Sequence, residues 1–252
     1  MKIVIISFDE PFYIPDLFSP LFNVHSRDIK GIIIVPPKPK SKSFIAFIKD
    51  QIEIMGPKVF TLRLLLYLKE QLLIALNLSK RSLAKVSEAY KIKSITSPSI
   101  NGSETKNFLK KIKPDLVIAQ VPEKISPEIL KLAKFGFVNK HASLLPKYKG
   151  LYPVFWSMLN KEKNAGFTFH FMTNEIDQGK ILFQRKVRIE KKDTVDTLYK
   201  KIFVLAGNDL SMVVNQIKNG KFKTRAMKKT KDYYRFPNKA SIKKFRKLGF
   251  SF

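Results

Sequence analysis

The sequence of 252 residues contains no cysteine. Disulfides, thiolate metal sites and a cysteine nucleophile are therefore excluded, and the absence fits a reducing compartment. Acidic residues are scarce, since 20 Asp and Glu stand against 48 Lys and Arg and give a formal net charge of +28. This balance favours anionic partners such as nucleic acid, phosphorylated substrates or an anionic membrane. Compositional drift toward lysine along the whole chain explains the charge equally well.

Long apolar runs are also missing. The apolar start of the chain is too short for a signal peptide because Asp9 and Glu10 follow it, and no stretch reaches the roughly 20 apolar residues of a spanning helix. We therefore expect a cytoplasmic protein. No Gly-x-Gly-x-x-Gly or Walker A loop follows the first apolar run, so the sequence gives no support for a nicotinamide or ATP cofactor.

Short apolar, β-branched runs alternate with helical stretches in the first half of the chain. Buried strands are predicted at residues 2–7, 31–35, 116–119 and 135–138, and helices at 104–113 and 127–134. This alternation predicts an α/β fold with a Rossmann-like, mostly parallel sheet and flanking helices. Further along, the pattern predicts a half-buried strand at 167–172, a second strand at 181–189 and a long helix at 194–220.

Two segments stand apart from this pattern. Residues 45–90 are predicted to form a helical insertion rich in leucine, which either packs in a core or against a partner, or lies on a membrane surface through its basic 58–81 helix. Residues 221–252 form a basic, aromatic C-terminal extension. The expected organisation is a catalytic domain over 1–220, with the insertion, followed by this extension.

The residues best suited to chemistry lie where the fourth predicted strand ends. Asn139 and His141 are two residues apart, so their side chains project to one side of an extended segment, and Asp177 lies in a later polar loop. An amide, an imidazole and a carboxylate together suit acyl transfer, because they supply an oxyanion donor, a proton carrier and a charged group to orient it. Ligands bind parallel sheets at this end of the strands.

The order of these residues within Asn-Lys-His-Ala-Ser-Leu-Leu-Pro at 139–146 and Asp-Gln-Gly-Lys-Ile at 177–181 resembles the catalytic core of the 10-formyltetrahydrofolate-dependent formyltransferases. That family includes glycinamide ribonucleotide, methionyl-tRNA and nucleotide-sugar N-formyltransferases. The resemblance covers roughly residues 1–35 and 90–215. It implies that Asn139, His141 and Asp177 are catalytic, that 10-formyltetrahydrofolate is the co-substrate and that no metal is needed. The folate contacts it implies are Gln120, Val121, Pro122, Ser143, Leu144, Leu145 and Gly179.

The C-terminal extension, residues 221–252, helps to predict which class of molecule accepts the formyl group. Its length is too small for the C-terminal barrel of methionyl-tRNA formyltransferases, and its aromatic and basic residues resemble the tails of nucleotide-sugar enzymes. We therefore expect a small-molecule acceptor, a nucleotide-linked amino sugar. A tRNA or membrane-associated amine, and a non-catalytic nucleic-acid-binding protein, stay open as alternatives, as does a homodimer.

Expectations also attach to three further positions. His170 is expected to be structural or to support the site from its strand, and His25 to lie on the surface. Lys140, between Asn139 and His141, is expected to point outward.

Overall fold

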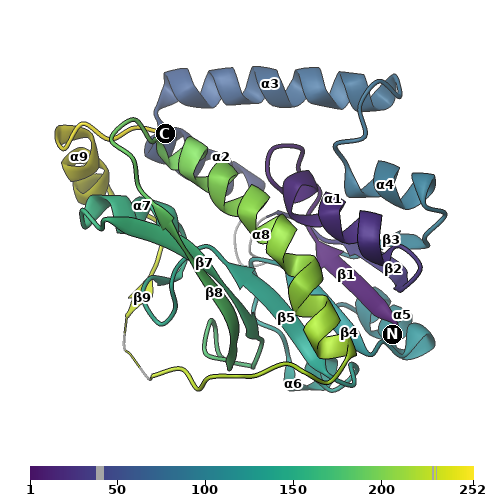
Figure 1. Ribbon diagram of the computed structural model, residues 1–252. Coiled ribbons are helices and arrows are strands. Elements are labelled where there is room, and N and C mark those ends of the chain that lie inside the picture. The colour runs from purple at the N-terminus through teal and green to yellow at the C-terminus, as the bar shows by residue number, and fades with distance from the viewer. Residues whose placement is uncertain (38–42, 229, 231) are drawn as a thin grey trace.

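A seven-stranded sheet runs through the middle of the molecule (Figure 1), in a computed structural model that describes residues 1–37, 43–228, 230 and 232–252. Its strand order is β3-β2-β1-β4-β5-β7-β8. The first five strands in that order are parallel, and β7 runs antiparallel to both of its neighbours, β5 and β8. The strands are β1 (Ile3–Ser7), β2 (Ile29–Ile34), β3 (Ser94–Thr96), β4 (Leu116–Gln120), β5 (Gly136–His141), β7 (Asn164–Phe171) and β8 (Ile181–Arg188). The predicted α/β fold with a mostly parallel sheet is confirmed.

Helices cover both faces of the sheet because its central strands are apolar on both sides. Ile3 and Ile5 of β1 belong to the core beneath α1 (Ile14–His25) and α8 (Val195–Lys218). Val4 and Ile6 belong to a second core beneath α5 (Ser103–Ile112) and α6 (Pro127–Leu130). The long helix α8 begins at a capping box, in which the Thr194 and Thr197 side chains and backbone N–H groups bond each other.

Some elements differ from the sequence prediction. The helices α1 and α7 (Pro153–Leu159) and the short strand β3 were not predicted. The strand predicted at 167–172 is present within β7, but its expected half-burial is wrong, because Phe169 and His170 on opposite faces are both 1% exposed. The segment after β5 covers the second face, where Thr168 Oγ1 bonds the backbone of Ser143 and Leu145. His25 is also buried and lies 3.2 Å from Asp28, contrary to the expected surface position.

The insertion consists of three helices, α2 (Phe44–Met55), α3 (Pro57–Ala75) and α4 (Leu83–Ala89). In Figure 1, α3 lies across the top of the molecule, apart from the layers around the sheet. Ile74 is its one buried residue. Packing of this helix within a core is therefore wrong, while packing against a partner and contact with a membrane surface stay predictions. Within the described residues, no helix combines the length and the apolar character that crossing a bilayer requires.

The C-terminal extension packs onto the rest of the chain. Its strand β9 (Tyr233–Tyr234) pairs in parallel with β6 (Lys149–Gly150), and its helix α9 (Lys239–Lys247) buries Phe245 against Phe155 with ring centroids 4.5 Å apart. Phe245 is 1% exposed and belongs to the same apolar core as α1 and α8. This packing carries Tyr233, Arg235 and Phe236 to the large cavity described next.

Candidate active site

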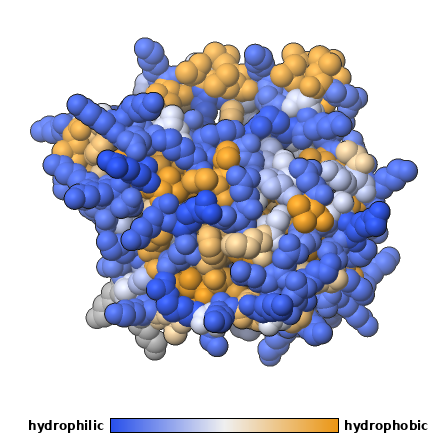
Figure 2. Space-filling view, in the orientation of Figure 1, coloured by the Kyte–Doolittle hydropathy of each residue, from blue (hydrophilic) through white to orange (hydrophobic). Residues whose placement is uncertain are grey.

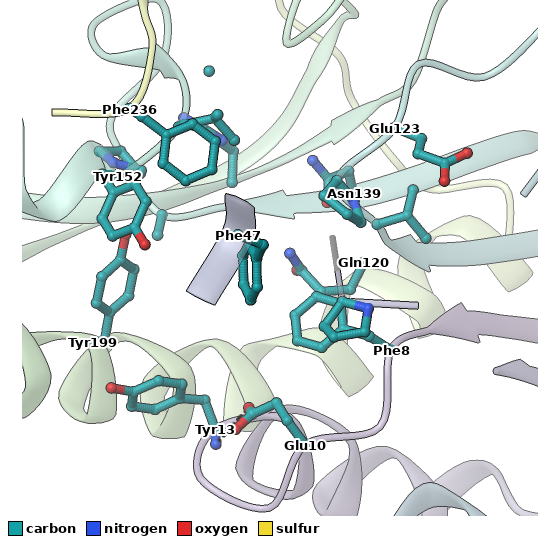
Figure 3. A pocket seen from close by; sticks show the side chains of 18 of the residues that line it. Phe8, Glu10, Tyr13, Phe47, Gln120, Glu123, Asn139, Tyr152, Tyr199 and Phe236 are labelled. Carbon is teal, nitrogen blue, oxygen red and sulfur yellow. Dashed lines mark hydrogen bonds between the residues drawn. The ribbon is translucent and has the colours of Figure 1, made fainter. Parts of the chain in front are cut away.

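A cavity of about 1410 Å³ opens beyond the carboxyl ends of β1, β4 and β5. Figure 3 shows aromatic rings of Phe8, Phe47, Tyr152, Tyr199 and Phe236 around it, with the amides of Gln120 and Asn139 on one side. Parallel strands bind ligands at this edge because their carboxyl ends meet there. The position agrees with the sequence-based expectation for the chemistry.

Asn139, His141 and Asp177 all line this cavity and lie close together. His141 Nδ1 is 3.5 Å from Asp177 Oδ1, and the side chains of the two residues are 7% and 8% exposed. Asn139 is 8% exposed and its Nδ2 lies 3.4 Å from His170 Nε2. Strand β5 presents Asn139 and His141 on one face, as the extended spacing predicted, and the loop between β7 and β8 brings Asp177 to them.

The loop that carries Asp177 is fixed by the backbone. Asp177 has a φ of +51°, a left-handed conformation that Asp tolerates better than most residues. The N–H of Gly150 donates to Asp177 Oδ2 at 2.8 Å. Gly150 itself has a φ of +95°, and an added Cβ would lie 2.3 Å from the carbonyl oxygen of Tyr234. A glycine is therefore required where the extension meets the active-site loop.

The protonation states of Asp177 and His141 are set by burial and by neighbouring groups. Burial alone would raise the pKa of Asp177, but His141, His170 and the N–H of Gly150 together lower it to about 2. Burial lowers the pKa of His141 despite the opposing charge of Asp177 and the carbonyl of Tyr148, which lies 2.8 Å from His141 Nε2. At neutral pH the site thus holds an ionised carboxylate beside a neutral imidazole.

His170 supports the cluster from β7, as the sequence suggested. Its Nδ1 donates to the carbonyl of Phe171 at 3.0 Å, and its Nε2 lies 3.4 Å from Asn139 Nδ2. Nε2 also lies 3.6 Å from Asp177 Oδ1. Asn139 and Asp177 therefore share one buried partner that the resemblance did not assign.

Two amide oxygens at the cavity lack partners. Asn139 Oδ1 and Gln120 Oε1 are buried and make no hydrogen bond with the residues that the structure describes. Both residues line the cavity. An unpaired buried acceptor is costly, at about 1–3 kcal/mol, so a ligand with N–H donors would stabilise this wall.

The seven residues expected to contact folate fall into two groups. Gln120, Val121 and Pro122 follow β4 and line the cavity. Ser143, Leu144, Leu145 and Gly179 do not line it. Ser143 Oγ donates to the carbonyl of Lys147, and the backbone of Leu145 bonds Thr168 and Gln184, so these residues hold the loop after β5 in shape.

Lys140 does not point outward, and that expectation is wrong. It is 3% exposed, and its Nζ lies 3.2 Å from the centroid of the Phe203 ring of α8. Burial lowers the pKa of Lys140 well below its ordinary value, although Glu10 opposes the shift. The reason is topological: β5 lies between β4 and β7, and helices or loops cover both of its faces.

The sequence did not predict that the insertion builds part of the cavity. Phe47 and Gln51 of α2 and Phe60, Leu64 and Tyr67 of α3 line it. Gln51 accepts a hydrogen bond from the hydroxyl of Tyr152 at 2.8 Å. The spacing of Phe60, Leu64 and Tyr67 is that of one helix face, which is a signal for an inward stripe. In the part of the chain that the structure describes, no group of His, Asp and Glu could hold a metal ion.

Comparison with known proteins identifies the family. A family model described as formyl transferase matches residues 75–214, which include Asn139, His141 and Asp177. The bifunctional polymyxin resistance protein ArnA of Wigglesworthia glossinidia brevipalpis is 44% identical over 122 residues, 48% of this chain and 19% of that protein. A methionyl-tRNA formyltransferase of Caldanaerobacter subterraneus is 38% identical over 122 residues, 48% of this chain and 40% of that protein. The chain thus matches less than half of the length of these relatives.

Solved structures share the fold at lower identity. WlaRD, a sugar 3N-formyl transferase solved in the presence of dTDP and 5-N-formyl-THF, is 20% identical with a TM-score of 0.58, and the match covers 93% of this chain and 69% of that one. A phosphoribosylglycinamide formyltransferase from Anaplasma phagocytophilum is 15% identical with a TM-score of 0.61, covering 92% of this chain and 96% of that one. Since the family model also matches more than half of the sequence and contains the cavity's amide, imidazole and carboxylate, the chain belongs to the formyl transferase family.

Proposed function

We propose that this protein transfers a formyl group from 10-formyltetrahydrofolate to the primary amine of a nucleotide-linked amino sugar. The observation that carries the proposal is the convergence of Asn139, His141 and Asp177 in one cavity of a chain from the formyl transferase family. Folate recognition is proposed at Gln120, Val121 and Pro122, which line the cavity beside Asn139. The two unpaired amide oxygens of this wall suit a ligand that carries N–H groups, such as a pterin.

The bound folate supplies a formyl carbon that an amine can attack, and the protein's side chains manage the charges. Asn139 donates an N–H to the formyl oxygen as that oxygen gains negative charge. His141, neutral at rest, accepts the proton that the attacking amine loses, because Asp177 with a pKa of about 2 is the weaker base. Asp177 stabilises the resulting imidazolium at 3.5 Å, and His141 then returns the proton to the departing folate nitrogen.

Recognition of the acceptor is proposed at the C-terminal extension. Tyr233, Arg235 and Phe236 line the cavity, and pairing of β9 with β6 holds them there. Aromatic rings stack on bases, and a guanidinium binds phosphate oxygens in a two-pronged geometry. The relatives at hand include proteins described as methionyl-tRNA formyltransferases, so tRNA is the acceptor to test against.

A competition assay tests the choice of acceptor. With 10-formyltetrahydrofolate present, nucleotide-linked amino sugars and methionyl-tRNA are offered together at near-physiological salt, and each product is identified by mass. We expect the sugar to gain the formyl group. Arg235→Ala should raise KM for the nucleotide sugar by about tenfold or more, the loss expected for a charge-assisted contact, without lowering kcat as strongly.

Lys239→Ala, an exposed change in the first turn of α9, is the matched control and should behave as the parent protein. Efficient formylation of methionyl-tRNA, with none of the sugars modified, would show that the proposed acceptor class is incorrect.

A further inference from the structure

Helix α3 exposes an apolar stripe that nothing in the described chain covers. Of the large apolar side chains that are exposed among the described residues, the majority belong to residues 44–78. Figure 2 shows such side chains gathered along the top of the molecule, where Figure 1 places α3. Leu62, Leu65, Leu72 and Leu76 are 59%, 59%, 59% and 58% exposed. Exposure of this much apolar side-chain surface to water is unfavourable, so the stripe indicates a binding surface for a partner.

The spacing of this stripe separates it from the inner face of the same helix. Leu62, Leu65, Leu72 and Leu76 recur at intervals of three, four and seven, and Lys58 and Lys69 occupy the remaining positions of that face. Phe60, Leu64 and Tyr67 lie on the opposite side and line the cavity. The outer stripe is therefore leucine-rich and basic, and it is distinct from the wall of the active site.

Contacts on its inner face fix the orientation of α3, so the helix does not rotate to bury its exposed leucines. Arg63 Nη1 lies 2.7 Å from Asp196 Oδ1 of α8, and Arg63 Nη2 donates to the Tyr13 hydroxyl at 2.6 Å. The same guanidinium stacks 4.9 Å from the centroid of the Phe12 ring. These contacts keep the outer stripe exposed to solvent.

Charge decides which partner fits the stripe. Lys58 and Lys69 are exposed, and the whole chain carries a net charge of +28. A second copy laid on the stripe would bring two strongly positive molecules and their lysines together, which is unfavourable. An anionic lipid surface offers the opposite charge to the lysines and an apolar interior to the leucines.

We propose that α3 seats the protein on the surface of an anionic lipid bilayer. The helix lies in the plane of the interface with Leu62, Leu65, Leu72 and Leu76 among the acyl chains and Lys58 and Lys69 at the headgroups. Because the inner face of α3 lines the cavity, this docking places the active site next to the membrane. The inference does not depend on which amine accepts the formyl group.

Vesicle flotation of the whole protein tests the proposal. The probes are vesicles of phosphatidylcholine alone and of phosphatidylcholine mixed with phosphatidylglycerol. We expect binding to the anionic vesicles to be at least about tenfold stronger than to the neutral ones, and to weaken with salt. Leu65→Gln with Leu72→Gln should lower it by about tenfold or more, because two apolar anchors are removed at unchanged charge.

The matched control is Val204→Gln with Met212→Gln, which changes exposed apolar residues of α8 that are 39% and 38% exposed. It should bind vesicles as the parent does, and circular dichroism should show both double variants folded. Lys58→Gln with Lys69→Gln, which leaves every leucine in place, should reduce the preference for anionic vesicles. Failure of the parent to bind anionic vesicles would overturn the proposal. So would parent-like binding by the leucine variant, or a dimer in solution that the leucine variant dissociates.

Discussion

Asn139→Ala is expected to lower kcat/KM for formyl transfer by about 100- to 1000-fold, the loss typical of a missing oxyanion donor. The residue is placed for this role by β5, which directs its amide into the cavity, where it lies 3.4 Å from His170. The fold should survive, since removing the amide also removes a buried oxygen that has no partner among the described residues. Steady-state kinetics and circular dichroism measure the two effects.

His141→Ala and Asp177→Ala should cause losses of similar size, and the double and triple variants should lose little more than the worst single variant. The three side chains act on one transition state, so their effects are not additive. The control is Asn164→Ala, at an exposed position on the same sheet, which should keep parental activity. A catalytic role would be contradicted for any of the three whose alanine variant keeps more than about a tenth of parental turnover, well short of the loss of an oxyanion donor.

Gly179→Ala is expected to disrupt both the stability of the fold and the geometry of the site. A Cβ at this position would lie 1.5 Å from the carbonyl oxygen of Phe171, a backbone atom that has no freedom to move aside within β7. The loop that carries Asp177 must then separate from the end of that strand. We expect a loss of about 1–3 kcal/mol or more in the free energy of unfolding, together with a large loss of activity as Asp177 leaves His141.

Denaturant unfolding and kinetics of the same preparation measure these effects. Gly249→Ala is the matched control, because an added Cβ there meets nothing within 4 Å and only its φ of +79° is unfavourable. That variant should lose only about 1 kcal/mol, the usual cost of a left-handed non-glycine residue, and keep its activity. Parental stability for Gly179→Ala would show that the close approach to Phe171 is not required.

The sheet and the shared face of Asn139 and His141 were predictable because each is encoded locally, whereas the resemblance alone linked Asp177 to them. Val4, Ile6 and their neighbours form β-branched runs of strand length, and such runs leave little choice of structure. Asn139 and His141 lie two residues apart, and that spacing alone sets both on one face of β5. The catalytic roles of Asn139, His141 and Asp177 remain proposals that the kinetic variants test.

Other features depend on contacts between distant segments, which spacing does not reveal. The burial of Lys140 follows from the position of β5 inside the sheet and from Phe203, which lies on a helix far along the chain. The spacing of Phe60, Leu64 and Tyr67 marks one face of α3, but it does not tell which face is covered, because α3 is apolar nearly all round. Its orientation is set by Arg63 binding to Tyr13 and Asp196.

The measurement that bears most directly on the proposed chemistry is calorimetric titration of the whole protein with 5-formyltetrahydrofolate, an unreactive analogue of the formyl donor. We expect saturable binding to one site, and Asn139→Ala should keep much of that affinity because its main effect is on the transition state. Replacing Gln120, which lines the same wall, by alanine should weaken binding. If folded parent protein shows no binding at millimolar ligand, the cavity is not a folate site and the proposed formyl transfer is contradicted.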